Sequence, residues 1–332
     1  MSAIAFWGDL HVGRLTKIVG EDGLRLHRKL LHQLTKETRQ VGARYVAVLG
    51  DIFPDPFPSQ EQMMVVLEAF SNARDLKFVC YLGNHDIYTA QINSLRLLSR
   101  LPEAGALTNV QFVIKPAMID FARRNVLVLP YGAPLGAVPN NTDLILFHNN
   151  VIGAKRDNNS PVTGGFHPNK FEKVLAVGGH LHTPQRVGSR IYFPGTQGQL
   201  TFGEGSAKKF MWLDDRMYSR PFQPPWELQT VTWSNDNPPE CNNPDTYYRL
   251  LFTHERPGPR WLANHPQVVS HKGGSKSIQS AAKQKVVSLI QRTNEQESDT
   301  QLLNRWLIQY TSLDKLARRR ALKIDEQLAE EE

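Results

Sequence analysis

The chain has 332 residues, of which 40% are hydrophobic and 21% are charged, a composition that excludes wholesale disorder and a length that suits one large and one small domain. Its longest apolar runs, such as 46–49, are strand-sized, so we expect no membrane span, and its first residues lack the basic region of a signal peptide. Two cysteines, Cys80 and Cys241, exclude a disulfide framework and favour a reducing, cytoplasmic compartment. The net charge of +7 is compatible with a polyanionic partner such as nucleic acid.

The first two thirds of the chain alternate short apolar runs with amphipathic helical patterns, which indicates an α/β fold. Ser59 is a good N-cap for one of the helices, with Gln62 at the capping-box position. In chain order, the expected elements are strand 3–7, helix 24–41, strand 45–49, helix 61–72 and strands 78–82, 126–129, 144–147, 175–177 and 190–193.

The last third of the chain changes in character. Residues 220–245 are rich in Pro, Asn and Asp and are typical of a linker. A strand is expected at 246–253, and two amphipathic helices close the chain after about residue 298. We therefore expect a main domain over 1–220, a linker over 221–245, a small domain over 246–297 and terminal helices over 298–332.

A polar cluster follows five of the predicted strands, at the point where each strand ends. Because ligands of open α/β sheets bind at the carboxyl ends of the strands, we expect these clusters to meet in space. Taken singly, each cluster is more often an ordinary turn or a satisfied histidine, and only their joint order favours a site. The clusters are Gly8-Asp9-Leu10-His11, Gly50-Asp51, Gly83-Asn84-His85-Asp86, Phe147-His148-Asn149 and Gly178-Gly179-His180-Leu181-His182.

Carboxylates and imidazoles with one amide oxygen, and with no thiolate, are a donor set suited to Mn²⁺, Fe²⁺ or Zn²⁺. Two neighbouring metal ions need one bridging carboxylate and about three further ligands each. His85 is left over beside the ligands, where it can act as an acid. The candidate metal ligands are Asp9, His11, Asp51, Asn84, His148, His180 and His182.

These motifs resemble, in order and spacing, the five motifs of the calcineurin-like metallophosphoesterase superfamily over residues 1–205. Within it the chain most resembles the SbcD-type nucleases of DNA double-strand-break repair, including the recombination nuclease subunits of bacteriophages. Three strings carry that finer likeness: Gly50-Asp51-Ile52-Phe53 followed by 56–59, Gly179-His180-Leu181-His182-Thr183-Pro184-Gln185, and Tyr192-Phe193-Pro194-Gly195 continuing to Thr201-Phe202-Gly203-Glu204.

The resemblance implies a four-layer α-β-β-α sandwich with a small C-terminal α+β capping domain and terminal partner-binding helices. It also implies two divalent metal ions, usually Mn²⁺, which activate water for phosphodiester hydrolysis in DNA. Asp9, His11 and His182 would hold one ion, and Asn84, His148 and His180 the other, with Asp51 bridging. His85 would be the catalytic histidine that is not a ligand, with Asp86 orienting it or a ligand. Some members carry a histidine three residues after the bridging aspartate, where this chain has Pro54, which leaves open whether Asp55 takes over that residue's role in positioning DNA.

The same resemblance implies an exonuclease or endonuclease that is a homodimer within a heterotetramer with an SbcC-like ABC-type ATPase. Helices at 61–72 and 94–101 are the candidates for the dimer contact. The protein would act in the cytoplasm, in the host cell if it is viral. DNA contacts are expected from the basic residues Arg249, Arg256, Arg260, Lys272 and Lys276, and ATPase contacts from Leu302, Leu303, Trp306, Leu307 and Tyr310.

Three other functions compete with the nuclease. A phosphoprotein phosphatase usually has an arginine close after the second motif, whereas Asp51 is followed by Ile-Phe-Pro, which disfavours it. A small-molecule or cyclic-nucleotide phosphodiesterase would use the same ligands and is not excluded by them. A non-catalytic scaffold that tethers DNA would have no need of the full ligand set and His85.

Overall fold

The computed structural model describes residues 2–89, 91–234, 236–252 and 257–273, with side chains to residue 270. Met1–Leu251 and Glu255–Lys272 form one compact unit, so the linker predicted at 221–245 falls inside it. The C-terminal helices predicted at 298–332, and residues 274–297 of the predicted capping domain, lie outside the described residues.

The first of two six-stranded sheets has the strand order β12-β11-β1-β2-β3-β4. Four neighbouring strands are parallel, and an antiparallel hairpin, β11–β12, pairs with β1 at the other edge. The bounds are β1 Ile4–Trp7, β2 Tyr45–Val48, β3 Lys77–Tyr81, β4 Val110–Val113, β11 Lys208–Leu213 and β12 Met217–Phe222.

The second sheet has the order β5-β6-β7-β8-β10-β9, with antiparallel strands only at its two edges. The predicted central strands of both sheets are confirmed to within a few residues, since each is a buried apolar run. The bounds are β5 Ala117–Phe121, β6 Arg124–Leu129, β7 Leu144–His148, β8 Leu175–Gly179, β9 Gln185–Val187 and β10 Ile191–Phe193.

The two sheets pack face to face, and the strand period of two decides which side chains lie between them. In β1, Ile4 and Phe6 belong to the cluster between the sheets, together with side chains of β6, β7 and β8. Ala5 and Trp7 point to the other face and belong to the cluster under the helices. The Trp7 indole nitrogen donates to Thr38 Oγ1 at 3.1 Å, which satisfies the polar group of a fully buried side chain.

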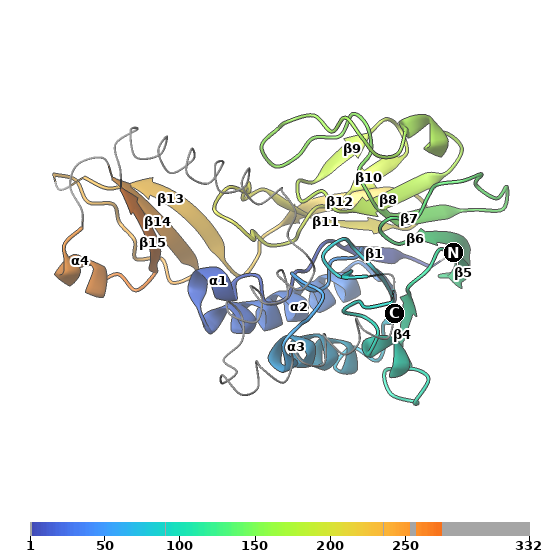
Figure 1. Cartoon of the computed structure of the whole chain (residues 1–332), viewed down its shortest axis with the longest axis horizontal. Coiled ribbons are helices and arrows are strands. Elements are labelled where there is room, and N and C mark those ends of the chain that lie inside the picture. The colour runs from blue at the N-terminus through green and yellow to red at the C-terminus, as the bar shows by residue number, and fades with distance from the viewer. Residues whose placement is uncertain (1, 90, 235, 253–256, 274–332) are drawn as a thin grey trace, which may run out of the picture. The chain divides into compact units, whose positions relative to one another are not determined.

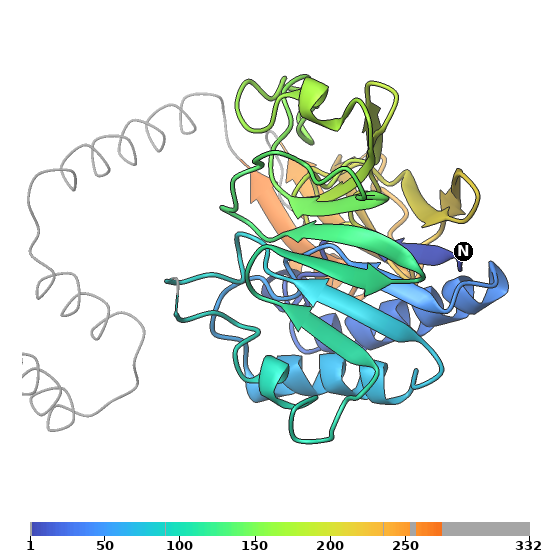
Figure 2. The same cartoon turned by 90° about the vertical axis from the view of Figure 1, so that its right-hand side faces the viewer.

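Helices α1 (Thr16–Val19), α2 (Asp22–Gln40) and α3 (Gln60–Ser71) cover the outer face of the first sheet, where α2 and α3 lie side by side (Figures 1 and 2). The capping box predicted for α3 is confirmed: Gln62 N donates to Ser59 Oγ, and Ser59 N donates to the Gln62 side chain. The outer face of the second sheet is covered by the connection between β7 and β8, which carries the 3-10 helix η2 (Pro168–Phe171). The predicted α/β sandwich is therefore confirmed, with an irregular layer over its second sheet.

Two local predictions were wrong. The helix predicted at 94–101 is a series of turns that contains only the short 3-10 helix η1 (Leu98–Arg100). Part of the predicted linker is a strand, β13 (Glu227–Thr232), which pairs in parallel with β14 (Thr246–Phe252) and thereby enters a three-stranded sheet. The prolines on both sides of β13 dominated the composition and concealed its short alternating pattern.

The three-stranded sheet is completed by β15 (Val268–Gly273), and the short helix α4 (Pro259–Ala263) precedes that strand. Leu228 of β13 and Tyr247 of β14 pack into the same core cluster as α2. Among the described helices, none combines the length and the apolar character that crossing a bilayer requires.

Candidate metal centre

The carboxyl ends of five parallel strands, three from the first sheet and two from the second, bring the predicted ligands together. Asp9 and His11 follow β1, Asp51 follows β2, and Asn84 follows β3. His148 is the last residue of β7, while His180 and His182 follow β8. Asp9, His11, Asp51 and His148 are buried, and Asn84, His180 and His182 are partly exposed.

Asp51 lies at the centre of this cluster. Its Oδ2 atom is 3.5 Å from His11 Nε2 and 3.4 Å from His148 Nε2, and its Oδ1 atom accepts a hydrogen bond from the amide of His85. Asp9 Oδ1 is 3.6 Å from His148 Nδ1 and accepts from the amide of His180. Asp51 therefore faces His11 of the first predicted ligand set and His148 of the second, as a bridging ligand must.

Asn84 joins the second group of predicted ligands. Its Oδ1 atom lies 2.7 Å from His180 Nδ1 and 3.1 Å from His148 Nε2. His148 Nδ1 is held at 2.7 Å from the carbonyl oxygen of Leu49, so the residue that follows β2 in the first sheet fixes the orientation of a second-sheet ligand.

The backbone at this edge is conformationally unusual. His11, Asp51 and His180 have φ values of 42°, 47° and 81°, in the left-handed region that non-glycine residues rarely enter. Gly50 has φ 85°, and a Cβ atom there would lie 2.4 Å from His148 Nδ1. Such strain persists only where surrounding contacts enforce it, and it concentrates at functional sites.

The charges of the cluster shift several pKa values. Burial opposes charge on His148, but the carboxylates of Asp51 and Asp9 outweigh it and raise the pKa of His148 to about 9. Burial lowers the pKa of His11 to about 3 and, with the nearby His148, that of His180 to about 4. Burial alone would raise the pKa of Asp51, but the neighbouring histidines hold it below its usual range. The two carboxylates thus favour positive charge on His148, whereas the lowered pKa values of His11 and His180 keep these two rings neutral.

The donors fit divalent metal ions. Asp9 Oδ2 and both ring nitrogens of His11 are buried without a hydrogen-bond partner, an arrangement that costs free energy unless a cation satisfies them. Two groups of donor atoms within 4.8 Å of one another, Asp9–Asp51–His148 and His11–Asp51–His85, share Asp51. Carboxylate, imidazole and amide donors suit borderline or hard divalent ions. The donors are thus chemically suited to divalent ions, and the role of each residue as a ligand stays a prediction.

His85 is exposed at the rim of the cluster. Its ring centroid lies 4.9 Å from that of His11, and its Nδ1 atom is 3.1 Å from the carbonyl oxygen of Pro54. Pro54 lacks an N–H but keeps this acceptor, which leaves His85 Nε2 for other contacts. Asp55 accepts from the amide of Phe57 and shapes the turn after Pro54.

Asp86 supports the loop that carries Asn84 and His85. Its carboxylate accepts from the amide of Gly83 and from the hydroxyl of Ser94 at 2.7 Å. Burial, with the charge of Asp51, raises its pKa to about 7. Asp86 thus bonds to the backbone of this loop, and its role in orienting His85 or a ligand stays a prediction.

Only some of the residues predicted to contact DNA lie in the described part of the chain. Arg249 donates to Thr230 Oγ1 at 2.9 Å and lies over the ring of Phe202 at 5.0 Å, so it packs within the three-stranded sheet region. Arg260 is exposed on α4. Arg256 and Lys276, the side chain of Lys272, and the partner contacts Leu302, Leu303, Trp306, Leu307 and Tyr310 lie outside the described residues.

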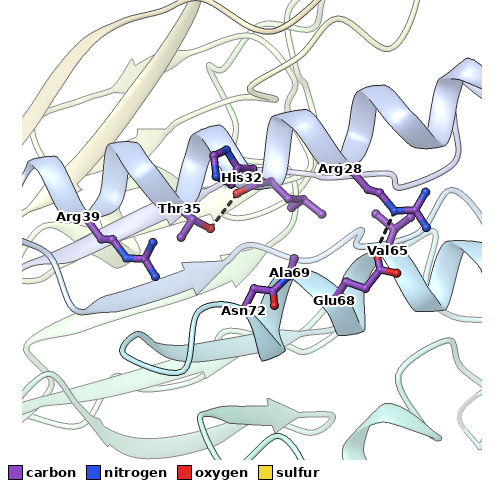
Figure 3. A pocket seen from close by; sticks show the side chains of 9 residues that line it. Arg28, His32, Thr35, Arg39, Val65, Glu68, Ala69 and Asn72 are labelled. Atoms are coloured by element: carbon purple, nitrogen blue, oxygen red, sulfur yellow. Dashed lines mark hydrogen bonds and ion pairs between the residues drawn. The ribbon is translucent and has the colours of Figure 1, made fainter.

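A separate hollow lies between α2 and α3 (Figure 3). Its charged side chains have partners: Arg28 donates to Glu68 at 2.8 Å, and Arg39 forms two hydrogen bonds with Asp75. None of the metal-centre residues lines it. The hollow therefore belongs to the helix layer and supplies no chemistry to the centre.

Glu204 has no role predicted from the sequence, although it ends the segment Thr201-Phe202-Gly203-Glu204 that resembles the nuclease branch. Its Oε1 atom is 3.3 Å from His182 Nδ1, and its other oxygen pairs with Lys208. Burial opposes its charge, yet His182 and Lys208 lower the pKa of Glu204 to about 2. The only signal in the sequence was an acidic residue at the end of the segment that follows the last ligand motif.

Comparison with known proteins agrees with this geometry. The calcineurin-like phosphoesterase family matches residues 2–184, more than half of the chain, so the chain belongs to that family. It is therefore a metal-dependent hydrolase, and two groups of its side chains that share Asp51 are placed so that they can hold a divalent ion. Among solved structures, that of TT1561 from Thermus thermophilus is 15% identical, with 66% of this chain and 98% of that chain covered and a TM-score of 0.42. No curated protein matches the chain.

Proposed function

We propose that this protein is a Mn²⁺-dependent DNA nuclease, the nuclease subunit of an SbcCD-like repair or recombination complex that acts in the cytoplasm. The observation that carries the proposal is the cluster of buried donors around Asp51, with an exposed histidine, His85, at its rim. The sequence strings around Asp51 and from Gly179 to Glu204 favour the nuclease branch within the family.

The residues of the site have separable tasks in phosphodiester hydrolysis. Bound at the two donor groups, divalent ions would activate water and neutralise charge on the phosphoryl oxygens. Asp51 holds the two groups together, and the Leu49 carbonyl orients His148. Exposed His85 can approach a substrate and donate a proton to the leaving oxygen of a sugar, which a phosphodiester requires.

The surroundings of Asp51 favour a diester over a monoester. A terminal phosphate carries more negative charge than a diester, and phosphatases meet it with a cationic side chain. Here Asp51 is followed by Ile52 and Phe53, both fully buried and apolar, and then by Pro54. This segment contributes no cation for a terminal phosphate.

The test offers three substrates to the purified protein with Mn²⁺, with Mg²⁺ or with EDTA: labelled double-stranded DNA, a chromogenic phosphodiester and a chromogenic monoester. We expect cleavage of DNA and of the diester, dependent on Mn²⁺ and abolished by EDTA. Cleavage of the chromogenic phosphodiester, but not of DNA, would favour a small-molecule phosphodiesterase. Binding of DNA without cleavage of any substrate would favour a scaffold.

An exposed apolar patch supports the homodimer. Phe57 and Leu97, each 61% exposed, line one hollow, and Tyr88, 64% exposed, packs against Phe57 at 5.2 Å between ring centroids. Exposed aromatic and aliphatic side chains gathered in this way are typical of protein interfaces. We therefore place the dimer contact at this patch, with a second copy of the chain as the occupant.

Light scattering tests the dimer. Leu97→Glu should convert a dimer to a monomer, because it buries a charge in the interface. Leu251→Glu, an exposed leucine on β14, is the control and should stay dimeric. A monomeric native protein at micromolar concentration contradicts this placement.

The ATPase partner is proposed for residues 298–332. Deletion of this segment should abolish co-purification with an SbcC-like ATPase while sparing cleavage of simple substrates. Loss of cleavage together with co-purification would contradict a purely partner-binding role.

A further inference from the structure

The segment between β10 and β11 holds an unusual number of buried polar side chains. Thr196, Gln197, Gln199 and Glu204 are all at least nine-tenths buried, as is Lys208 at the start of β11. Polar groups are buried at a cost unless they are bonded, so each is expected to have a specific partner.

Part of this segment supports the first ligand motif. Gln197 Oε1 accepts a hydrogen bond at 2.8 Å from the amide of Gly8, the residue before Asp9. The amide of Thr196 donates to the carbonyl oxygen of His182 at 3.1 Å. The segment therefore bonds to the backbone of Gly8, next to the predicted ligand Asp9. It also bonds to the backbone of the predicted ligand His182.

Glu204 is fixed from one side by three donors. Its Oε2 atom accepts from the Lys208 ammonium group at 3.0 Å, from the Thr196 hydroxyl at 3.2 Å and from the amide of Leu200 at 3.3 Å. Thr196 can donate because its oxygen accepts from Lys208 at 2.8 Å. These bonds leave Oε1 directed at His182 Nδ1, 3.3 Å away.

The contact determines which nitrogen of His182 is free. A carboxylate can only accept, so Nδ1 must carry the proton in this bond. Nε2 is then the unprotonated nitrogen, the form in which imidazole binds a metal ion. The ring of His182 lies beside that of His11, with 5.3 Å between centroids, on the side of the metal centre.

Glu204 could instead be a ligand of a further ion, because Asp157, His182 and Glu204 offer atoms within 4.8 Å of one another. The Lys208 ammonium group argues against this, since it already neutralises the Glu204 carboxylate and would repel a cation. Asp157 is 3.6 Å from His182 Nδ1, accepts from Thr183 and is exposed. Glu204 is the buried partner and therefore the one that sets the proton position.

We propose that Glu204 is a positioning residue of the metal centre: by accepting from His182 Nδ1, it holds the tautomer and ring orientation in which His182 Nε2 binds one of the two metal ions. This inference rests on the metal centre of the proposed function and not on DNA as the substrate.

Glu204→Gln is the decisive variant because it changes one group and almost no volume. Lys208, Thr196 and Leu200 all donate to the position of Glu204 Oε2. The amide oxygen of the introduced glutamine must therefore take that position, because its amide nitrogen cannot accept. The amide nitrogen then faces His182 Nδ1, which must accept and so transfers its proton to Nε2. The metal-binding nitrogen is thereby blocked.

Lys208→Met is the matched control. It breaks the same buried network and should lower the stability of the protein, because Glu204 loses its counter-charge. It leaves the Glu204 carboxylate facing His182, so metal binding should be kept.

The experiment measures Mn²⁺ binding by calorimetry, the imidazole ¹⁵N shifts of His182 in the metal-free protein, and thermal unfolding of both variants. We expect Glu204→Gln to weaken one of two Mn²⁺ sites about 10–100-fold and to move the His182 proton to Nε2. Lys208→Met should keep both sites and the native tautomer, although it unfolds at a lower temperature.

Native Mn²⁺ affinity in Glu204→Gln, or equal weakening in Lys208→Met, overturns the proposal. A native protein that binds two Mn²⁺ ions but leaves DNA intact contradicts the nuclease proposal alone. A native protein that binds no Mn²⁺ contradicts the metal centre itself.

Discussion

The two sheets of the sandwich supply different chemistry to the same edge. The first sheet contributes both carboxylates, Asp9 and Asp51, and the amide of Asn84, whereas the second contributes only imidazoles. The first sheet therefore provides the negative charge that attracts cations, and the second provides donors that carry no negative charge. The centre exists only where the sheets meet, since neither donor set could balance two divalent ions alone.

The sheets also hold some of their ligands differently, although His180 of the second sheet shares the left-handed backbone of His11 and Asp51. Asp51 lies in a left-handed turn after Gly50, so backbone conformation fixes it. His148 and His182 are instead oriented by acceptors at their Nδ1 atoms, the Leu49 carbonyl and Glu204. Substitutions in the first sheet should thus change the charge of the centre and its backbone conformation. Substitutions in the second sheet should instead change the orientation of the imidazole rings.

Asp51→Asn should have the largest effect. It removes the charge of the residue shared by both donor groups, so we expect loss of both metal ions, by metal analysis, and of detectable phosphodiesterase activity. Asp120→Asn, at an exposed aspartate on β5, should keep both. Retention of two ions by Asp51→Asn would show that the first sheet does not supply the bridging charge.

His85→Ala should come next. Because His85 is exposed and its Nδ1 contacts a backbone carbonyl, metal content should stay native while kcat falls by about 10²–10⁴-fold. His32→Ala, an exposed histidine on α2, serves as the control in the same diester assay. An unchanged kcat in metal-loaded His85→Ala would rule out its role as the acid.

Gly50→Ala tests the contact between the sheets. Gly50 has φ 85° and a Cβ there would lie 2.4 Å from His148 Nδ1, so the free energy of unfolding should fall by about 2–3 kcal/mol. Gly42→Ala shares a positive φ but faces open space, so we expect a loss of about 1 kcal/mol. Urea unfolding compares them, and equal losses would mean that His148 accommodates the methyl group.

Ser59→Ala should have the smallest effect. It removes the N-cap of α3, which covers the outer face of the first sheet, and should cost about 1 kcal/mol in urea unfolding. Mn²⁺ binding should be unchanged, and Ser71→Ala at the other end of α3 is the control. A loss of metal affinity would show that the helix layer acts on the centre.

The central strands and the candidate ligands could be predicted because two simple rules reinforce each other. Buried parallel strands are continuous apolar runs, and the polar residues directly after them gather at one edge. Ser59 and Gln62 likewise marked the start of α3 by local chemistry alone. Each of these signals lies within a few residues of the feature that it predicts.

The features that could not be predicted, the turns at 94–101 and the role of Glu204, depend on contacts between residues that are distant in the sequence. At 94–101 the leucines have helical spacing, but Ser94 bonds to Asp86 and Leu97 is exposed, so turns replace the helix. Glu204 follows a glycine and resembles a surface acid in the sequence. Only its contacts with His182, 22 residues away, and with Lys208 reveal a buried role.

The pairing of β1 with β11 has a consequence for the order of assembly. Residues 2–184 contain every candidate ligand, yet β1 pairs along one side with β11, and Gln197 bonds to the amide of Gly8. A nascent chain that has left the ribosome only to residue 184 therefore carries all the ligands beside an unpaired strand edge. Its centre matures only after β11 emerges, so the earliest motif of the chain waits for one of the later strands.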